Sequence, residues 1–390
     1  MRFCDIIYLQ MFDKQIIVWE CIDVALTQRE KEILRFIKKN PMISQEELAQ
    51  LMGISRSAVA GHIANLMKKG FILGRGYVVR DFKGITVIGG ANIDIKGKPY
   101  SELKQHTSNP GHINIAPGGV GRNIAHNLAQ LSLPVTLLSV VGNDDEGRRL
   151  LEETRQAGVN VEQIVISNTR RTGIYLAILN AIGDMDVALS GMDILEELNI
   201  QYLESKMEVI KNSEIVVFDT NIPKDSIKYI VELCYNNNIP VVAEPVSIDK
   251  AKKLIGVLDK IDYVTPNKEE LESISGVKIA NDEDMKKAVK YLRQKGVKNV
   301  IVTLGERGVY ISSEEVEKFI EPYQAEIVDA TGAGDALTAG LVYGIFNGYT
   351  LDVSAKLGLA AASLTISSPY TVNPFLNENQ LKNIVKEIVK

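Results

Sequence analysis

The chain has 390 residues, of which 45% are apolar and 24% charged, and it carries a formal net charge of −5 at pH 7. These values are ordinary for a soluble globular protein of two or three domains, and no apolar run reaches the roughly 18 residues that a membrane span requires. The three cysteines (Cys4, Cys21 and Cys234) lie far apart, and the four histidines form no metal-ligand pattern. This argues against a disulfide framework and a zinc site, and it favours a cytoplasmic location.

Residues 1–26 form an extension to which we assign no role. The segment is rich in apolar residues but is broken by charged ones, such as Asp5, Asp13 and Glu20. Because no basic segment leads into an uninterrupted apolar one, the pattern does not favour a signal peptide. The segment is either a short packed strand and helix or the product of an upstream start codon, and the sequence leaves both interpretations open.

Residues 27–83 have the pattern of a small basic domain, with 11 Lys and Arg residues against 5 Asp and Glu. Ser/Thr-x-x-Glu capping boxes at 27–30 and 44–47 predict the starts of two short helices. A third helix is expected from 55 to about 69, after a glycine turn, and residues 71–79 are typical of a hairpin. We therefore predict three short helices followed by a hairpin with a basic tip.

This arrangement resembles a winged helix-turn-helix domain. The polar face of the third helix and the tip of the hairpin carry side chains suited to phosphates and base edges. We predict that four of them contact DNA: Arg56, Ser57, Lys68 and Arg75. The resemblance implies binding to double-stranded DNA. The alternative is a small helical domain that mediates dimerisation or caps the larger domain.

Residues 84–390 form a larger, acidic domain, with 31 Lys and Arg residues against 40 Asp and Glu. Apolar, β-branched runs predict strands at 85–88, 135–141, 214–218, 240–243, 263–264 and 300–304, and helical patterns between them include 122–131, 144–157 and 282–295. This alternation predicts an α/β domain with a mostly parallel sheet flanked by helices, in which ligands bind at the carboxyl ends of the strands. Further short runs predict a small β lid over the active site, at 93–98, 113–116, 173–179 and 185–189.

The most informative segment is Asp-Ala-Thr-Gly-Ala-Gly-Asp at 329–335, which leads into an apolar helical stretch. The small residues Gly332, Ala333 and Gly334 allow the backbone to approach a ligand closely, and the first N–H groups of the helix suit a phosphate or an oxyanion. Asp335 is an acid at a site for anions, which is unfavourable unless its carboxylate acts as a base. We therefore predict that Asp335 is a catalytic base. The alternative is a capped helix after a tight turn.

Two motifs near strand ends predict the contacts of a sugar. Asp94, after the first strand, can accept two hydroxyl hydrogens of a polyol, although a solvated loop acid has the same appearance. The Gly-rich turn at 117–123 lacks the spacing of a dinucleotide fingerprint, and its bare backbone would let a sugar approach closely. The candidate substrate-binding residues are Asp94, Gly118, Gly119, Arg122 and Asn123.

Two further motifs predict the nucleotide side of the site. Asn267 and Glu270 lie one helical turn apart after a strand. Together they can order the water shell of Mg²⁺, which usually keeps several waters. A strand and turn at 303–308 can pass beneath a nucleotide, and the candidate contacts there are Thr303, Gly305 and Gly308.

These motifs occur in the order and spacing of the ribokinase-like (pfkB) carbohydrate and nucleoside kinases, which the whole acidic domain resembles. The motifs are Asn-x-Asp94, Gly-Gly-x-Gly-x-Asn123, Asn-x-x-Glu270, Thr-Leu-Gly305 and Asp-x-Thr-Gly-Ala-Gly-Asp335. The resemblance implies that Asp335 is the base, that the N–H groups of residues 332–335 form an anion hole, and that ATP and Mg²⁺ are used. It also implies that Asn373 packs against adenine, and it suggests a homodimer. A monovalent cation such as K⁺ is a further expectation, near Asp329 and Thr331.

Two segments bear on the choice of substrate within this family. Ribokinases usually have Lys and Ala where this chain has Val120 and Arg122, which disfavours free ribose. The motif at 118–123 and the segment Glu-Pro-Val-Ser at 244–247 resemble pseudouridine kinases, although those enzymes more often carry Asp where Glu244 stands. The resemblance therefore implies phosphorylation of the 5′-hydroxyl of pseudouridine by ATP, which gives pseudouridine 5′-phosphate.

Two alternatives remain open. The chain can be a kinase for another sugar or nucleoside, such as ribose, fructose or inosine. It can also be a DNA-binding regulator that uses a kinase fold as a ligand sensor. The intact Gly-Ala-Gly-Asp335 segment argues against a pure sensor, because a sensor has no need of the base.

Overall fold

A computed structural model of the protein describes residues 26–40, 42–68, 71–72 and 84–386. The chain divides into two compact units between Asp81 and Phe82, and each unit is described by itself. Within the described ranges, no helix is both long enough and apolar enough to cross a bilayer.

The described part of the N-terminal unit contains α1 (Gln28–Lys39), α2 (Gln45–Met52) and α3 (Arg56–Lys68). Both predicted capping boxes are present: Thr27 and Ser44 each accept the N–H of a Glu three residues later, and that Glu accepts the N–H of the capping residue in return. The three helices pack around a common core of buried aliphatic side chains. The predicted helices are confirmed, whereas all but the first two residues of the predicted hairpin lie outside the described residues.

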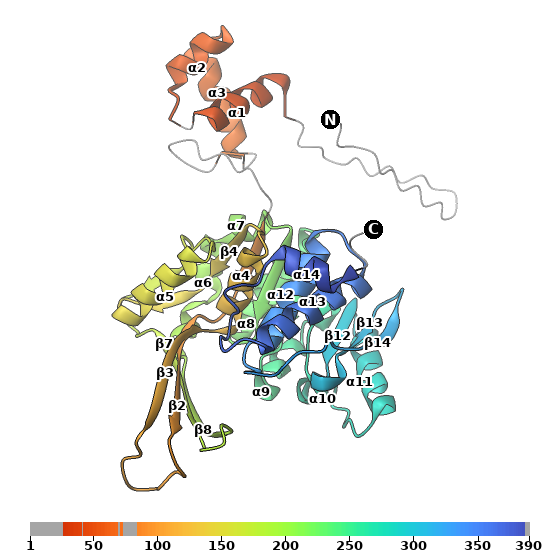
Figure 1. Cartoon of the computed structure of the whole chain (residues 1–390). Helices are drawn as coiled ribbons and strands as arrows, with labels where there is room; N and C mark the ends of the chain where they lie inside the picture. The colour runs from red at the N-terminus through yellow and green to blue at the C-terminus, as the bar shows by residue number, and fades with distance from the viewer. Residues whose placement is uncertain (1–25, 41, 69–70, 73–83, 387–390) are drawn as a thin grey trace, which may run out of the picture. The chain divides into compact units, whose positions relative to one another are not determined.

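The C-terminal unit is built on an eight-stranded sheet with the order β14-β13-β12-β11-β10-β9-β1-β4 (Figure 1). In that order, the strands are Glu317–Ile320, Val309–Ser312, Asn299–Thr303, Tyr263–Val264, Val241–Glu244, Ile215–Asp219, Ile85–Ile88 and Val135–Leu138. The strands from β12 to β4 are parallel to their neighbours, and β13 and β14 are antiparallel. The predicted sheet is therefore confirmed, and the carboxyl ends of its parallel strands meet at one edge.

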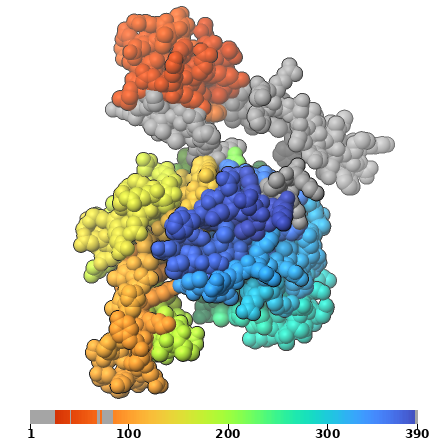
Figure 2. Space-filling model, viewed as in Figure 1, coloured from red at the N-terminus to blue at the C-terminus, as the bar shows by residue number. Residues whose placement is uncertain are grey.

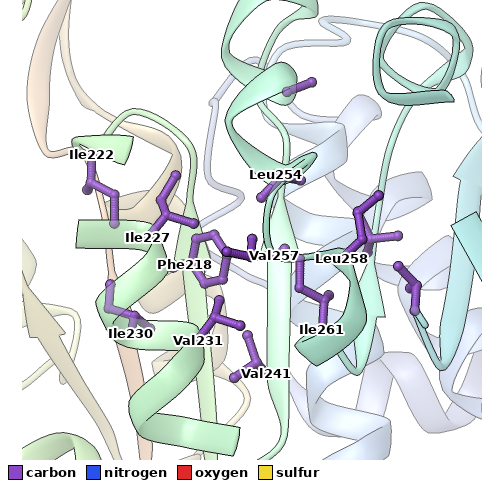
Figure 3. Close-up of a cluster of buried hydrophobic side chains, with 14 of the residues drawn as sticks. Phe218, Ile222, Ile227, Ile230, Val231, Val241, Leu254, Val257, Leu258 and Ile261 are labelled. Carbon is purple, nitrogen blue, oxygen red and sulfur yellow. The ribbon is translucent and has the colours of Figure 1, made fainter. Parts of the chain in front are cut away.

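Helices cover both faces of this sheet. Because successive side chains of each strand point to opposite faces, each strand contributes to a core on either side. On one face, Phe218 of β9 packs with Ile227 and Val231 of α8 (Lys224–Asn236) (Figure 3). The same face carries α6 (Ile200–Ser205), α7 (Met207–Lys211), α9 (Ile248–Ala251), α10 (Lys268–Ser275) and α11 (Asp282–Gln294). On the other face, Val217 is buried with residues of α4 (Val120–Gln130) and α12 (Ala333–Phe346).

The remaining helices complete the second face and the connections. Helix α13 (Leu351–Ile366) packs against β13, and α14 (Glu378–Ile384) packs against α13. Helix α5 (Asp145–Gln156) contributes Leu150 to a small core beneath the lid. Short 3₁₀ turns are η1 (Asp193–Glu197), η2 (Lys252–Leu254), η3 (Leu258–Lys260) and η4 (Gly305–Arg307).

A second sheet, with the order β3-β2-β7-β8, extends from the body of the C-terminal unit (Figures 1 and 2). Its strands are Gly111–Gly118, Asn92–Pro99, Gly173–Leu179 and Met185–Gly191. It contains all four short strands that the sequence predicts for the lid, and we refer to it as the lid sheet. Alternation along β2 places Asp94 and Lys96 on one face of this sheet and Ile93 and Ile95 on the other.

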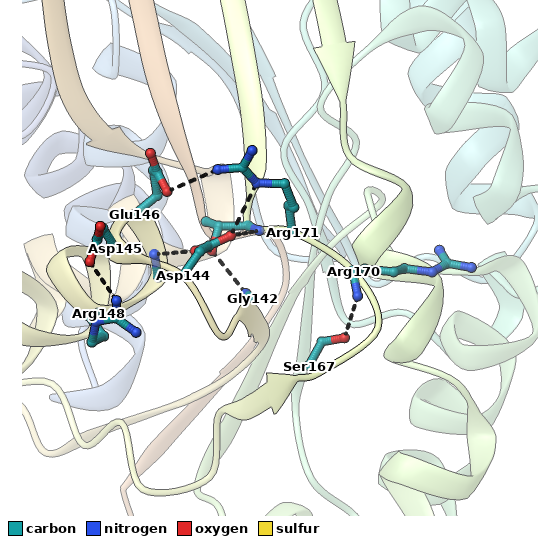
Figure 4. Close-up of polar contacts among 10 residues, drawn as sticks. Gly142, Asp144, Asp145, Glu146, Arg148, Ser167, Arg170 and Arg171 are labelled. Atoms are coloured by element: carbon teal, nitrogen blue, oxygen red, sulfur yellow. Dashed lines mark hydrogen bonds and ion pairs between the residues drawn. The ribbon is translucent and has the colours of Figure 1, made fainter.

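The start of the lid strand β7 is fastened to the body of the domain by Asp144, the N-cap of α5 (Figure 4). Its carboxylate accepts the backbone N–H of Thr172 at 2.8 Å and the hydroxyl of the same residue at 2.5 Å. The Thr172 hydroxyl oxygen in turn accepts the N–H of Gly142 at 2.9 Å. Because Thr172 directly precedes β7, these bonds fix one end of the lid sheet.

One predicted strand is divided in the structure. The sequence predicts a single strand over 135–141, whereas β4 is followed by a separate β5 (Val140–Gly142) that pairs with β6 (Val165–Ser167). At the break, the Ser139 hydroxyl donates to the carbonyl of Gly89 at 2.7 Å. Ser139 interrupts the apolar run at the break, but a single polar residue does not specify a change of partner strand, so the sequence alone could not show this division.

Candidate active site

Asp335 lies in the first turn of α12 and contacts Asn123 in the first turn of α4. The amide Nδ2 of Asn123 donates to Asp335 Oδ2 at 2.8 Å, across 212 positions of the sequence. Helices α4 and α12 lie side by side on the same face of the sheet. The segment predicted to bind phosphate and the segment predicted to bind sugar therefore meet at this hydrogen bond.

Gly332 shapes the start of α12. It is the N-cap of the helix and has a left-handed backbone with φ 82°, and a Cβ there would lie 1.9 Å from the carbonyl oxygen of Thr371. Only glycine fits this position. Because Gly332 has no side chain to cap the helix, the first turn of α12 keeps N–H groups for an anion. The N–H of Ala333 donates to the carbonyl of Ala330 at 3.3 Å. No atom lies within 4 Å of the place of a Cβ at Gly334, so the loop leaves room there.

The Asp335 carboxyl is half-buried, and its environment changes its acidity. Burial, together with the negative charges of Asp219 and Asp94, raises the pKa of Asp335 to about 7, against the hydrogen bond from Asn123. A carboxyl group with a pKa near neutrality is matched to proton transfer at neutral pH. This arrangement can therefore remove a proton from a hydroxyl group placed beside it.

Asp94 lies in the strand β2 and not on a solvated loop. Its Oδ1 accepts a hydrogen bond from Asn92 Nδ2 at 2.6 Å, and burial raises its pKa. A Cβ at Gly118 would lie 2.2 Å from Asp94 Oδ2, and a Cβ at Gly119, where φ is 98°, would lie 2.4 Å from the carbonyl oxygen of Gly90. Both glycines are required for the close approach of the β3–α4 turn to its neighbours.

Arg122 is only 3% exposed and lies behind Asn123. Its Nε donates to Thr154 Oγ1 at 3.2 Å and its Nη1 donates to Asn123 Oδ1 at 3.4 Å. Because the amide oxygen of Asn123 accepts from Arg122, its Nδ2 is the group left to donate to Asp335. Burial lowers the pKa of Arg122 to about 10, so the guanidinium remains charged at neutral pH. The structure thus gives Arg122 a role in orienting Asn123, and a direct contact with substrate would require it to leave these partners.

Asp219, the fully buried last residue of β9, also belongs to the site and is not among the residues predicted from the sequence. Its carboxylate accepts backbone N–H groups of Gly90 at 2.8 Å, Gly121 at 2.7 Å and Asn221 at 2.9 Å. These bonds tie the loop after β1 to the first turn of α4. The available signal was an acid directly after the apolar run 214–218, in the same kind of position as the other predicted site residues.

Glu244 is a second carboxyl group near Asp335. It ends β10, and its Oε2 accepts the hydroxyls of Thr265 at 2.6 Å and Thr338 at 2.7 Å. Burial, together with the charges of Glu270 and Asp335, raises the pKa of Glu244 to about 8 despite these hydrogen bonds. The carboxyl groups of Asp335, Glu244 and Glu270 therefore lie near one another at the carboxyl edge of the sheet, between α10 and α12.

Asn267 and Glu270 form a capping box at the start of α10. Asn267 Oδ1 accepts the N–H of Glu270 at 2.8 Å, and Glu270 Oε2 accepts the N–H of Asn267 at 2.9 Å. Each side chain keeps a second polar atom for another partner. Among the residues that the structure describes, no group of three or more His, Cys, Asp or Glu is arranged to hold a metal ion. A Mg²⁺ ion at this place would therefore have to keep water ligands.

The turn predicted to pass beneath a nucleotide follows β12. Thr303 ends that strand and forms an isolated parallel bridge with Asn267, so the two predicted nucleotide segments are adjacent. Gly305 and Gly308 both have left-handed backbones, with φ of 58° and 79°. No atom lies within 4 Å of the place of a Cβ at Gly305, which leaves that side of the turn open.

The amide of Asn373 is engaged in a backbone turn. Its Nδ2 donates to the carbonyl of Leu364 at 2.8 Å, and its Oδ1 accepts the N–H of Phe375 at 3.0 Å. The side chain is 7% exposed. The structure thus gives Asn373 a part in shaping this loop, and its contact with adenine stays a prediction.

Lys96 of the lid sheet lies at the place where the sequence suggests a monovalent cation. Its Nζ donates to Thr331 Oγ1 at 2.8 Å and lies 3.4 Å from Asp329 Oδ2. The ammonium group already supplies a positive charge to these two oxygens. A bound K⁺ ion near them stays a prediction.

The predicted DNA contacts are partly within the described residues. Arg56, at the start of α3, is 71% exposed in its side chain, and its Nη1 lies 3.8 Å from Glu46 Oε2. The Ser57 hydroxyl is exposed and lies 3.0 Å from that of Ser55. The side chain of Lys68 and the whole of Arg75 lie outside the described residues. Arg56 and Ser57 are therefore available to a ligand in solution.

Comparisons with known proteins match both units of the chain. The family description "pfkB family carbohydrate kinase" matches residues 83–378, and "winged helix-turn-helix DNA-binding" matches residues 26–72. The Escherichia coli (strain K12) protein "Uncharacterized sugar kinase YeiI" is 39% identical over 361 residues, 92% of this chain and 99% of its own. The pseudouridine kinase of the same strain is 35% identical over 309 residues, 79% of this chain and 98% of its own. A structure of a putative ribokinase II from E. coli in complex with ATP and Mg²⁺ shares the fold, with a TM-score of 0.68 and 20% identity, over 78% of this chain and 100% of that one.

Proposed function

Because the chain belongs to the pfkB family of carbohydrate kinases and carries a winged helix-turn-helix domain ahead of the kinase domain, we propose that it phosphorylates the 5′-hydroxyl of pseudouridine with ATP. Membership of the family supports a phosphotransferase with an alcohol group as acceptor. The observation that carries the proposal is the hydrogen bond between Asn123 and Asp335, which joins the sugar segment to the phosphate segment. The similarity to the E. coli pseudouridine kinase supports the choice of nucleoside.

In the proposed mechanism, Asp335 removes the proton of the 5′-hydroxyl as its oxygen attacks the γ-phosphorus of ATP. The new O–P bond forms in line with the bond that breaks, and ADP leaves. The N–H groups of residues 332–335 donate to the phosphoryl oxygens, which gain charge during the transfer. Asp94 and Asn123 orient the ribosyl hydroxyls. Positioning and electrostatics thus account for the rate, since the protein forms no covalent intermediate.

In the proposed site, the nucleotide binds at the edge of the sheet where β11 and β12 end. Thr303, Gly305 and Gly308 would lie beneath the nucleotide, and Asn373 near its adenine. A bound Mg²⁺ supplies positive charge to the phosphate oxygens. Asn267 and Glu270 would hold its waters through the side-chain atoms that the capping box leaves available. The E. coli neighbour with ATP and Mg²⁺ supports these two cofactors, since it shares the fold.

We expect pseudouridine to be the best acceptor in a side-by-side assay with ATP. Its kcat/KM should exceed that of ribose, fructose, uridine and inosine by about 10–100-fold, the range that a few pocket contacts provide. Uridine is the matched control, because it differs from pseudouridine only in the attachment of the base. A higher kcat/KM for ribose would contradict the choice of nucleoside and leave the family activity standing. Absence of transfer to every acceptor would favour the ligand-sensor alternative.

For the N-terminal domain we propose binding to double-stranded DNA through α3 and the segment after it. Replacing Arg56 with Ala should lower affinity and reduce the slope of log affinity against log salt by about one phosphate contact, as should replacing Arg75. Lys31→Ala, which removes one charge from the exposed face of α1, is the control and should leave the slope unchanged. Binding to DNA from its own promoter region, measured by anisotropy over a range of salt, with and without nucleoside, checks this. Salt-independent or absent binding would make the domain a structural or dimerising appendage.

We also propose that the protein is a homodimer that pairs through the apolar face of the lid sheet. Strand register places one row of apolar side chains across all four strands: Ile115, Ile95, Leu176 and Leu189. Leu189 is 66% exposed and Ile115 is 47% exposed, and exposed apolar side chains that lie together on one face favour a partner there. A second copy can cover it by two-fold symmetry. Light scattering should give twice the 43.0 kDa of the chain, and Leu189→Glu should give the monomer; a wild-type monomer would contradict the proposal.

A further inference from the structure

Lys96 connects the lid sheet to the anion-binding loop at 329–335. It lies in the middle of β2, and its Nζ donates to Thr331 Oγ1 at 2.8 Å and faces Asp329 Oδ2 at 3.4 Å. The Lys96 and Asp329 side chains are 26% and 35% exposed, so the pair is partly shielded from solvent and from screening by salt. The contact joins segments 233 to 235 residues apart in the sequence.

The residues that Lys96 contacts also set the shape of the loop. Asp329 Oδ1 accepts the backbone N–H of Thr331 at 2.8 Å, which closes the turn that leads directly into Gly332. Burial favours the neutral form of Asp329, but the hydrogen bonds from Thr331 and the charge of Lys96 hold its pKa below the usual value. One oxygen of Asp329 therefore holds the turn and the other faces the lid.

The same strand also carries the predicted sugar contact. Asp94 precedes Lys96 by two residues, so both side chains lie on the same face of the lid sheet. The positive charge of Lys96 acts on Asp94 as well as on Asp329. A displacement of β2 that accompanies sugar binding must therefore change the contact between Lys96 and the loop.

We propose that Lys96 is a positioning residue that couples closure of the lid sheet to the shape of the anion-binding loop. When β2 lies over the sugar, Lys96 holds Asp329 and Thr331, and the N–H groups that follow Gly332 take their working positions. When β2 moves away, the loop loses this partner. Phosphoryl transfer is thereby confined to the state in which the acceptor is covered and water is excluded. The catalytic part of this inference depends on the proposed kinase function, whereas the contact between lid and loop does not.

The first test compares Lys96→Met with Lys98→Met, because Lys98 lies two residues along on the same face of β2 and is exposed. Lys96→Met should lower kcat by about 10–100-fold, the effect of misplacing reacting groups by about 1 Å. It should also raise the ADP formed per molecule of acceptor phosphorylated, because water reaches a poorly closed site. Lys96→Arg, which keeps the charge, should recover part of the activity, and Lys98→Met should match the wild type. Normal kcat and normal coupling of ATP use in Lys96→Met would overturn the proposal.

A double-mutant cycle with Asp329→Asn tests whether the two residues act as a unit. Asn keeps an oxygen for the Thr331 N–H but removes the charge that faces Lys96. The double variant should then lose no more kcat than the more affected single variant, whereas independent effects would multiply. Multiplied losses would contradict the coupling. Added K⁺ that restores the kcat of Lys96→Met, and not that of the other variants, would show that the ammonium group and a monovalent cation are interchangeable at this place. The proposal expects this result, because it assigns to Lys96 a positive charge that holds the loop.

The second test does not depend on turnover. Amide hydrogen exchange of residues 329–335 should be faster in Lys96→Met than in the wild type and in Lys98→Met. Unchanged exchange in this segment would overturn the contact itself. If exchange of this segment is faster in Lys96→Met but the wild type phosphorylates no nucleoside or sugar, the proposed function is overturned. The link between lid and loop is then retained.

Discussion

Replacing Asp335 with Asn is expected to lower kcat by about 10²–10⁴-fold, the usual contribution of a positioned base. The amide has nearly the shape of the carboxylate and keeps an oxygen for the hydrogen bond from Asn123, but it cannot take the proton of the acceptor hydroxyl. The fold and the affinity for ATP should persist. Steady-state turnover with pseudouridine measures the first effect, and circular dichroism and a titration with ATP measure the others.

Asp284→Asn is the matched control for this substitution. Asp284 is the third residue of α11, as Asp335 is of α12, and the two helices cover opposite faces of the sheet. Replacing the Asp284 carboxylate should leave kcat unchanged.

The pH dependence of the wild type gives a second test. Its kcat/KM should fall about tenfold per pH unit below about pH 7, because Asp335, whose pKa burial raises to about 7, then takes up a proton. Near-normal turnover of Asp335→Asn, or a flat profile between about pH 5.5 and 7, would remove Asp335 from the mechanism.

Replacing Gly332 with Ala is expected to destabilise the kinase domain by about 2–4 kcal/mol. A left-handed backbone is strained for alanine, and the new Cβ would be forced against the Thr371 carbonyl oxygen, which lies 1.9 Å from its ideal place. These two costs are of the order of 1–3 kcal/mol each. The obstacle is backbone and cannot rotate away. Urea unfolding followed by circular dichroism measures the loss.

Gly334→Ala provides the control within the same loop. Gly334 is the second residue of α12, has no left-handed backbone, and has no atom within 4 Å of the place of a Cβ. Alanine there should leave the free energy of unfolding unchanged or raise it by about 0.5–1 kcal/mol, because it favours the helix more than glycine does. Equal losses in both variants would mean that the loop tolerates no side chain anywhere. Stability of Gly332→Ala equal to that of the wild type would show that the loop around Thr371 can move.

The parts of the site that could be predicted from the sequence are those in which one short segment contains the geometry. The small residues at 332–334 followed by Asp335 require only their own backbone to create an anion site. The pair Asn267 and Glu270 shows the limit of this reasoning. Its spacing predicts a binding pair, which stays a prediction, and the same spacing also forms a capping box, as the equivalent pattern at residues 27–30 does.

The parts that could not be predicted depend on which distant segments meet. Asp219 becomes important only because β9 lies beside β1 in the sheet and brings its carboxylate to Gly90 and Gly121. Lys96 has no local signal, since its partners lie more than 230 positions away. The orientation of Arg122 could not be predicted for another reason. Its residue type suggests a ligand contact, whereas its place on α4 directs its side chain toward Thr154.

The alternation of side chains along β2 determines where residues can be added to or removed from this part of the chain. The strand presents Asp94 and Lys96 to the loop of α12 and Ile95 to the proposed dimer surface, so a single strand serves two different tasks. Adding or removing one residue between Asp94 and Lys96 would turn one of these two side chains to the other face of the sheet. The carboxylate or the ammonium group would then enter the surface between copies. Length changes beyond Pro99, at the tip of the hairpin, leave this frame intact. Proteins that share this site are therefore expected to differ in length at the tip and to keep the interval from Asp94 to Lys96.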